Sequence, residues 1–131
     1  MIGQQFLSYA WLILSAFKTT IALAFAGFFT ATAMALLLTF SMVWGPRWLS
    51  TAIDWLCRVL RGVPLILALF MVFYGLPRLG IRLPPFYSAV IGIAVVDAAY
   101  QQQIFYSAIK SVSEKQLEAA YSVGLTPWQA Y

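Results

Sequence analysis

Residues 19–46 contain no charged side chain, and residues 19–43 are almost wholly apolar. A helix that crosses a bilayer needs about 20 apolar residues at 1.5 Å rise each. The stretch therefore predicts a transmembrane helix over residues 19–43. Gly27, Ala31 and Ala35 recur within it at four-residue spacing, a stripe that allows close approach of another helix. Small residues are also common in membrane helices, so both interpretations remain open.

The composition supports a membrane protein. Hydrophobic residues make up 63% of the 131-residue chain and charged residues only 9%, whereas soluble domains average roughly 25% charged. Such a chain cannot cover a soluble globule with charge. Its net charge of +4 comes from basic residues scattered singly between apolar runs, which argues against nucleic-acid binding and suits contact with membrane lipid at the ends of spans.

Two further spans are predicted, over residues 57–77 and 86–109. The second apolar run is short, so we expect it to include residues before Gly62. Basic residues are enriched on cytoplasmic flanks, which predicts an outside N-terminus and a cytoplasmic C-terminus in the bacterial inner membrane. The predicted inner flanks hold Arg47, Arg58, Arg61, Lys110 and Lys115, and the outer flanks hold Lys18, Arg78 and Arg82.

A polar segment at residues 112–130 follows the last span. Ser113 and Gln116 have the spacing of a capping box, and Gly124 suits a helix end, which together predict a short helix over residues 113–124. A helix this short is unstable alone in water, so we expect a soluble partner to bind it. Its apolar stripe consists of Leu117, Ala120, Tyr121 and Gly124.

A second helix start follows at once. Thr126 is placed as a cap, Pro127 at the first helical position and Gln129 three residues after the cap. The chain stops at Tyr131, before that helix develops. We expect the chain to be the front part of a longer protein.

Four motifs resemble those of permease subunits in bacterial ABC importers of the polar amino-acid type (histidine, glutamine, arginine or opine). The first is the EAA loop, Glu118-Ala119-Ala120 with Gly124 four residues on. The other three are Arg61-Gly62-Val63-Pro64-Leu65-Ile66, Phe73-Tyr74-Gly75-Leu76-Pro77, and Ala98-Ala99-Tyr100 followed by Ile104 and Ala108-Ile109-Lys110-Ser111-Val112. The resemblance as a whole runs from about Leu14 to the C-terminus. Departures occur at Gln103, Tyr106, Ser113 and Lys115, where the family usually has Glu, Arg, Pro and Gly.

The resemblance implies an all-α membrane protein, the N-terminal part of a five-span permease domain truncated after the EAA loop. It implies a homodimer or heterodimer with a second permease subunit, two ABC ATPase subunits and an extracytoplasmic amino-acid-binding protein. The ATPase would use the ATP, so this chain is expected to bind no cofactor. The resemblance also implies which residues couple this chain to the ATPase: Leu117, Glu118, Ala119, Ala120, Tyr121 and Gly124.

Asp97 is the one acidic residue within a predicted span, and such residues usually face a cavity or a partner. Together with Tyr100 and Gln101 it could line a substrate path and contact the amino or guanidinium group of an amino acid. A hydrogen bond between packed helices is the competing interpretation. Arg61, Gly62 and Pro64 are expected to shape the inner end of the second span, with Arg61 at lipid headgroups or a loop carboxylate.

An enzyme is not supported by the residues. The chain has no His, one Cys and four scattered acidic residues, which provide neither a catalytic set nor a metal site. Besides the permease, two functions stay open. One is a small membrane scaffold or regulatory protein that recruits another soluble partner, and the other is a non-functional truncated permease fragment.

Overall fold

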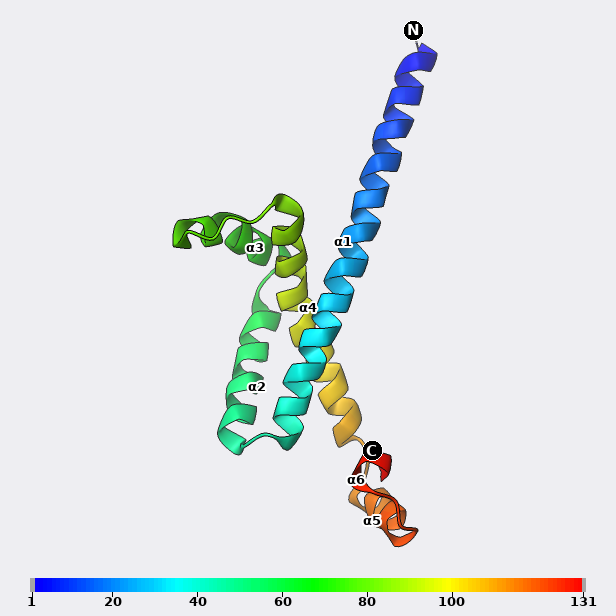
Figure 1. Cartoon of the computed structure of the whole chain (residues 1–131), viewed down its shortest axis with the longest axis vertical. Coiled ribbons are helices and arrows are strands. Elements are labelled where there is room, and N and C mark those ends of the chain that lie inside the picture. Colours follow the sequence, from blue (N-terminus) through cyan, green and yellow to red (C-terminus); the bar gives the residue numbers. More distant parts are fainter. Residues whose placement is uncertain (1, 131) are drawn as a thin grey trace.

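The computed structural model describes residues 2–130, with side chains for residues 9–127, 129 and 130. The described chain is all-helical, as predicted, and contains no strand (Figure 1). Its elements are α1 (Ile2–Trp44), α2 (Arg47–Gly62), α3 (Leu65–Phe70), the π-helical η1 (Met71–Gly75), the 3₁₀ turn η2 (Leu76–Leu79), α4 (Pro85–Lys110), α5 (Glu114–Ser122) and α6 (Pro127–Ala130).

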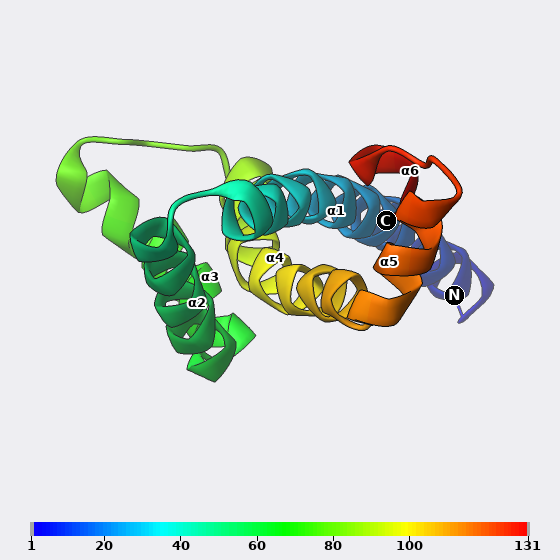
Figure 2. The same ribbon diagram turned by 90° about the horizontal axis from the view of Figure 1, so that it is seen from below.

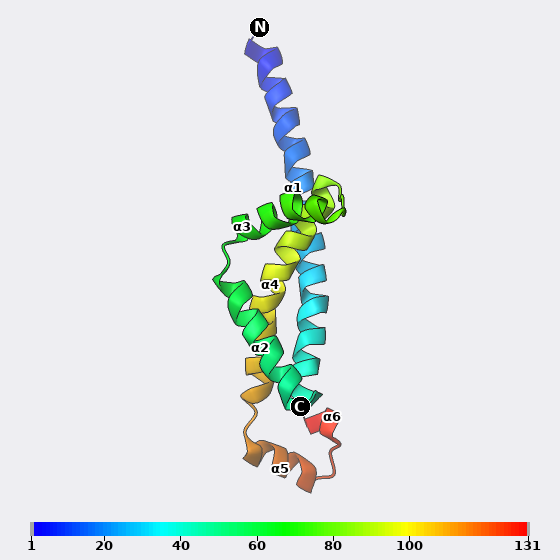
Figure 3. The same ribbon diagram turned by 90° about the vertical axis from the view of Figure 1, so that its left-hand side faces the viewer.

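The first helix is longer than the predicted 19–43. α1 has 43 residues, about 65 Å at 1.5 Å per residue, and its N-terminal part extends past all the other helices (Figure 3). Residues 4–43 contain no Pro and only one Gly, so nothing in the sequence stops the helix before Trp44. The apolar stretch marked where α1 can cross a membrane, not where the helix begins.

The core lies between α1 and α4, which run side by side (Figure 2). Ala31 and Ala35 of α1 are fully buried against Ala94 and Ala98 of α4. One turn earlier, a Cβ placed on Gly27 would lie 2.8 Å from Cγ2 of Ile93. The stripe of small residues is therefore the surface on which α4 packs.

The second predicted span, 57–77, is wrong as one continuous helix. α2 ends at Gly62, and the direction changes by 102° before the segment Leu65–Leu79. Pro64 causes the break, because it restricts the residue before it to extended conformations, and Val63 has φ −85° and ψ 122°. Gly92 of α4 lets α3 approach, since a Cβ there would lie 2.8 Å from Cδ2 of Leu69.

Among the described helices, only α1, over Tyr9–Trp44, is long and apolar enough to cross a membrane by itself. The bent pair Arg47–Gly62 and Leu65–Leu79 passes the same criterion only as a unit. α4 matches the predicted 86–109 to within a residue at each end. It is long enough to cross, but Asp97 and the three glutamines at 101–103 make it more polar than α1.

Candidate functional site

The short helix expected near the C-terminus is α5, and it begins with the predicted capping box. The Ser113 side-chain oxygen accepts a hydrogen bond from the Gln116 backbone N–H at 3.4 Å. In return, the Ser113 backbone N–H donates to Oε1 of Gln116 at 3.0 Å. Two backbone donors that the first helical turn leaves unpaired are thereby satisfied.

Gly124 ends α5 in the left-handed conformation, with φ +82°. The Leu125 N–H donates to the Ala120 carbonyl at 3.1 Å and the Gly124 N–H to the Tyr121 carbonyl at 3.0 Å, which is a Schellman motif. The second cap follows immediately, as the Thr126 N–H donates to Oε1 of Gln129 at 3.0 Å. The sequence predicted both helix ends because each depends on residues a few positions apart.

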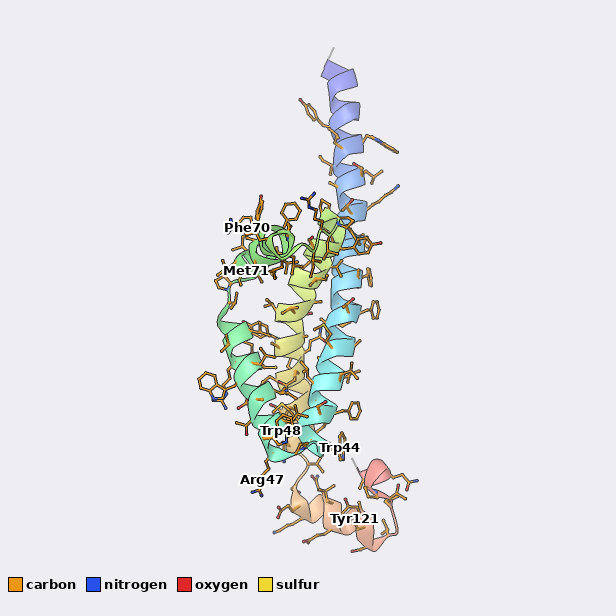
Figure 4. All side chains as sticks on the ribbon, turned by 60° about the vertical axis from the view of Figure 1, so that its left-hand side comes forward. Trp44, Arg47, Trp48, Phe70, Met71 and Tyr121 are labelled. Carbon is orange, nitrogen blue, oxygen red and sulfur yellow. The ribbon has the colours of Figure 1, made fainter. Side chains whose placement is uncertain are left out.

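α5 lies beyond the end of the α1–α4 pair, and α6 is the described helix closest to it (Figure 4). Glu118, Ala119 and Tyr121 are exposed, while Leu117 and Ala120 are half-buried. A cavity of about 260 Å³ separates the start of α5 from the ends of α1 and α4, and Leu117 faces it. Five of the six coupling residues predicted from the EAA loop thus lie on one short helix, and Gly124 lies in the turn that follows it.

The side chains of Asp97 and Gln101 meet one turn apart on α4. Nε2 of Gln101 donates to Oδ2 of Asp97 at 2.8 Å, and the Thr32 hydroxyl of α1 lies 2.8 Å from Oε1 of Gln101. Thr32 was missed by sequence reasoning, because a lone threonine in an apolar helix carries no pattern that predicts its partner. The three side chains form a polar link between α1 and α4.

Tyr100 belongs to a different contact. Its hydroxyl donates to the Arg61 carbonyl on α2 at 2.9 Å, and Nη1 of Arg61 donates to the Ala99 carbonyl at 3.2 Å. These two bonds hold the end of α2 against α4 just before the bend at Gly62 and Pro64. Arg61 is therefore bound to the protein backbone, and Tyr100 does not join Asp97 and Gln101.

Gln102 is a second residue whose role the sequence did not indicate. Its side chain is 1% exposed, and Nε2 lies 2.9 Å from Sδ of Met42 on α1. The Thr39 hydroxyl of α1 is 3.5 Å from the Gln102 carbonyl. Among the described residues, no three His, Cys, Asp or Glu side chains come together as metal ligands.

Comparison with known proteins places this arrangement in a family. Residues 37–131 match the family described as binding-protein-dependent transport system inner membrane component. In Bacillus subtilis, the probable amino-acid ABC transporter permease protein YckA is 34% identical over 110 residues, covering 84% of this chain and 49% of the relative. The L-cystine transport system permease protein TcyB of the same organism is 34% identical over 107 residues, covering 82% and 46%.

The fold has a solved counterpart. A crystal structure of an amino acid ABC transporter with histidines superposes with a TM-score of 0.84 at 27% identity, covering 96% of this chain and 59% of the other. The chain spans between a third and about half the length of the curated relatives it matches. The family match extends over α2, α4 and the exposed helix α5 together, so the chain belongs to the binding-protein-dependent transport system inner membrane components.

Proposed function

We propose that this chain is a permease component of an ATP-binding-cassette importer for polar amino acids. Relatives over most of its length carry amino-acid permease names, and the family match includes the segment with the EAA loop. The observation that carries the proposal is α5, a capped helix beyond the end of the α1–α4 pair on which Glu118 and Ala119 of the EAA loop are exposed. A helix of nine residues gains most of its stability from a surface that it packs against.

In this proposal α5 docks on a cytoplasmic ATPase subunit. Glu118 is exposed for pairing with a basic group, Ala119 permits close approach, and Gly124 turns the chain away after one short helix. The ATPase binds and hydrolyses the ATP, and this chain contributes the membrane path without a cofactor. A second permease subunit and an extracytoplasmic binding protein complete the importer.

We place the chain in the inner membrane with its N-terminus outside and its C-terminus in the cytoplasm. Tryptophans and basic residues gather where membrane meets water, with basic residues favoured inside. Trp44, Arg47 and Trp48 lie at the end of the bundle nearest α5 (Figure 4). That arrangement supports a cytoplasmic position for α5, where an ATPase can reach it.

We also propose that Asp97 and Gln101 take part in the substrate path. Asp97 is only half-buried, and Gln101 donates to Oδ2, one of its two carboxylate oxygens. In the assembled transporter, Asp97→Asn should change uptake or the preference among amino acids. Unchanged uptake and unchanged preference would leave only the packing role.

The coupling proposal is tested by co-purification with the cognate ATPase. Gly124→Trp should abolish binding, because a large side chain is forced into the left-handed region at the docking helix. Gly80→Trp is the matched control, since Gly80 also has a positive φ (+84°) and no atom within 4 Å of an added Cβ. Binding that survives deletion of residues 114–125 would refute the coupling role and favour a scaffold that recruits another partner.

A further inference from the structure

An open polar cavity of about 620 Å³ lies where α2 faces α4 and the end of α1. This volume falls within the usual range of roughly 300–1,000 Å³ for small-molecule sites. The cavity's lining residues on α4 follow Asp97 by about two helical turns, towards α5. Its lining residues are Met42, Ser50, Thr51, Asp54, Arg58, Arg61, Gln103 and Tyr106.

Three of the four charged side chains of α2 line this cavity, because the helical repeat places them on one side. Ser50, Asp54, Arg58 and Arg61 recur at intervals of four, four and three residues, which places them on one face. The adjacent face is buried and apolar, with Ile53 and Cys57.

The face away from the bundle is apolar but exposed, with Trp48 at 72% and Trp55 at 68% exposure. These tryptophans suit lipid contact, so α2 presents apolar groups to lipid and Asp54, Arg58 and Arg61 to the cavity. A helix that needed only solubility or headgroup contact would carry its charges on the outer face.

The cavity wall presents both signs of charge side by side. Nη2 of Arg58 is 2.6 Å from Oδ2 of Asp54. Arg61 is half-buried, and Nη1 of its guanidinium donates to the Ala99 carbonyl, whereas a guanidinium has five N–H donors. An arginine fork recognises a carboxylate with paired hydrogen bonds, and a carboxylate recognises an ammonium.

We propose that this cavity binds the zwitterionic head of an α-amino acid. The α-carboxylate binds Arg61 and Arg58, and the α-ammonium binds Asp54, which exchanges its pairing with Arg58 for the ligand. Tyr106 and Gln103 of α4 form the opposite polar wall. The site recognises the α-carboxylate and the α-ammonium, which all amino acids share. The side chain of the ligand points towards the open mouth of the cavity. This inference rests on the proposed permease function and adds a binding site on the α5 side of Asp97.

Direct binding tests the proposal with the full chain in nanodiscs of phosphatidylcholine and phosphatidylglycerol. L-glutamine, L-arginine and L-cystine are titrated calorimetrically, and at least one should bind. For glutamine, loss of the carboxylate (4-aminobutanamide) or of the ammonium (glutaramic acid) should each weaken binding about tenfold or more. Arg61→Gln and Asp54→Asn should weaken it similarly, and Arg47→Gln, an exposed α2 arginine outside the cavity, should not.

A labelling experiment keeps the test valid if a charge variant fails to fold. Cys57 is the only cysteine and is fully buried, so the natural chain is a low-reactivity background. Ser50→Cys puts a thiol on the cavity wall, and the bound amino acid should slow its modification by a membrane-impermeant maleimide. A thiol at Thr126, near α6, should show no protection.

Three outcomes would overturn the site. They are no binding of any of the three amino acids, equal binding of the analogue that lacks one charge, or competition by phosphatidylethanolamine, which would make it a lipid-headgroup site. Failure of the permease proposal is distinguishable from these outcomes, because the unmodified chain would then not co-purify with the ATPase. A chain that binds the ATPase but protects no thiol at position 50 refutes this site alone.

Discussion

Replacing Ala31 with leucine should weaken the α1–α4 packing more than any exposed substitution on α1. Ala31 is 0% exposed, and the facing alanines of α4, Ala94 and Ala98, are each 1% exposed. Three added carbons therefore have no free volume, and the two helices must separate or adopt strained side-chain conformations. Such overpacking costs about 1–3 kcal/mol.

The control is Ala33→Leu, two residues along the same helix on an exposed face. Leucine and alanine have similar helix propensities, so the control should change stability by less than about 0.5 kcal/mol. Reversible unfolding in mixed micelles, followed by circular dichroism during titration with dodecyl sulfate, measures both variants. At 1.4 kcal/mol per factor of ten, Ala31→Leu should shift the folding equilibrium by about 5- to 150-fold. Equal effects of the two substitutions would refute the packing argument.

The remaining predictions concern single hydrogen bonds. Ser113→Ala should cost about 1 kcal/mol of helix stability by removing the cap, and it should weaken ATPase co-purification. Ser122→Ala, at the other end of α5, is the control and should not weaken it. Equal binding by the two variants would contradict the role of the cap. Tyr100→Phe should lower the unfolding free energy by about 0.5–1.5 kcal/mol in the same micelle assay, and an unchanged midpoint would show that the bond to α2 contributes nothing. Thr32→Val should cost about 1 kcal/mol and alter uptake if Asp97 is in the path, while Thr30→Val, on an exposed face, serves as its control and should match the parent.

Local chemistry explains why the C-terminal part could be predicted closely. The caps at Ser113 and Thr126 and the turn at Gly124 each depend on groups within five residues. Proline and glycine act through the backbone at their own positions and direct neighbours. No distant contact has to form before such a boundary exists, so a short sequence window contains the information.

The second span shows where that reasoning failed. Hydropathy over residues 57–77 indicated one membrane segment, while Pro64 breaks the helix and the chain turns by 102°. The local rule for Pro64 predicts a break but not the direction of the following helix. That direction depends on Leu69 fitting over Gly92 and on the bonds between Arg61 and α4.

The sequence by itself determined the helical, membrane-type character of the chain, the small-residue stripe on α1 and the ends of α5, because each follows from composition, periodicity or short-range hydrogen bonds. The tertiary structure alone decided that Thr32 meets Gln101, that Gln102 is buried at Met42, and that the ionic face of α2 borders a cavity. Those pairings join residues about 40 to 70 positions apart. Their formation depends on how the helices pack and rotate about one another, and a one-dimensional pattern does not contain that rotation.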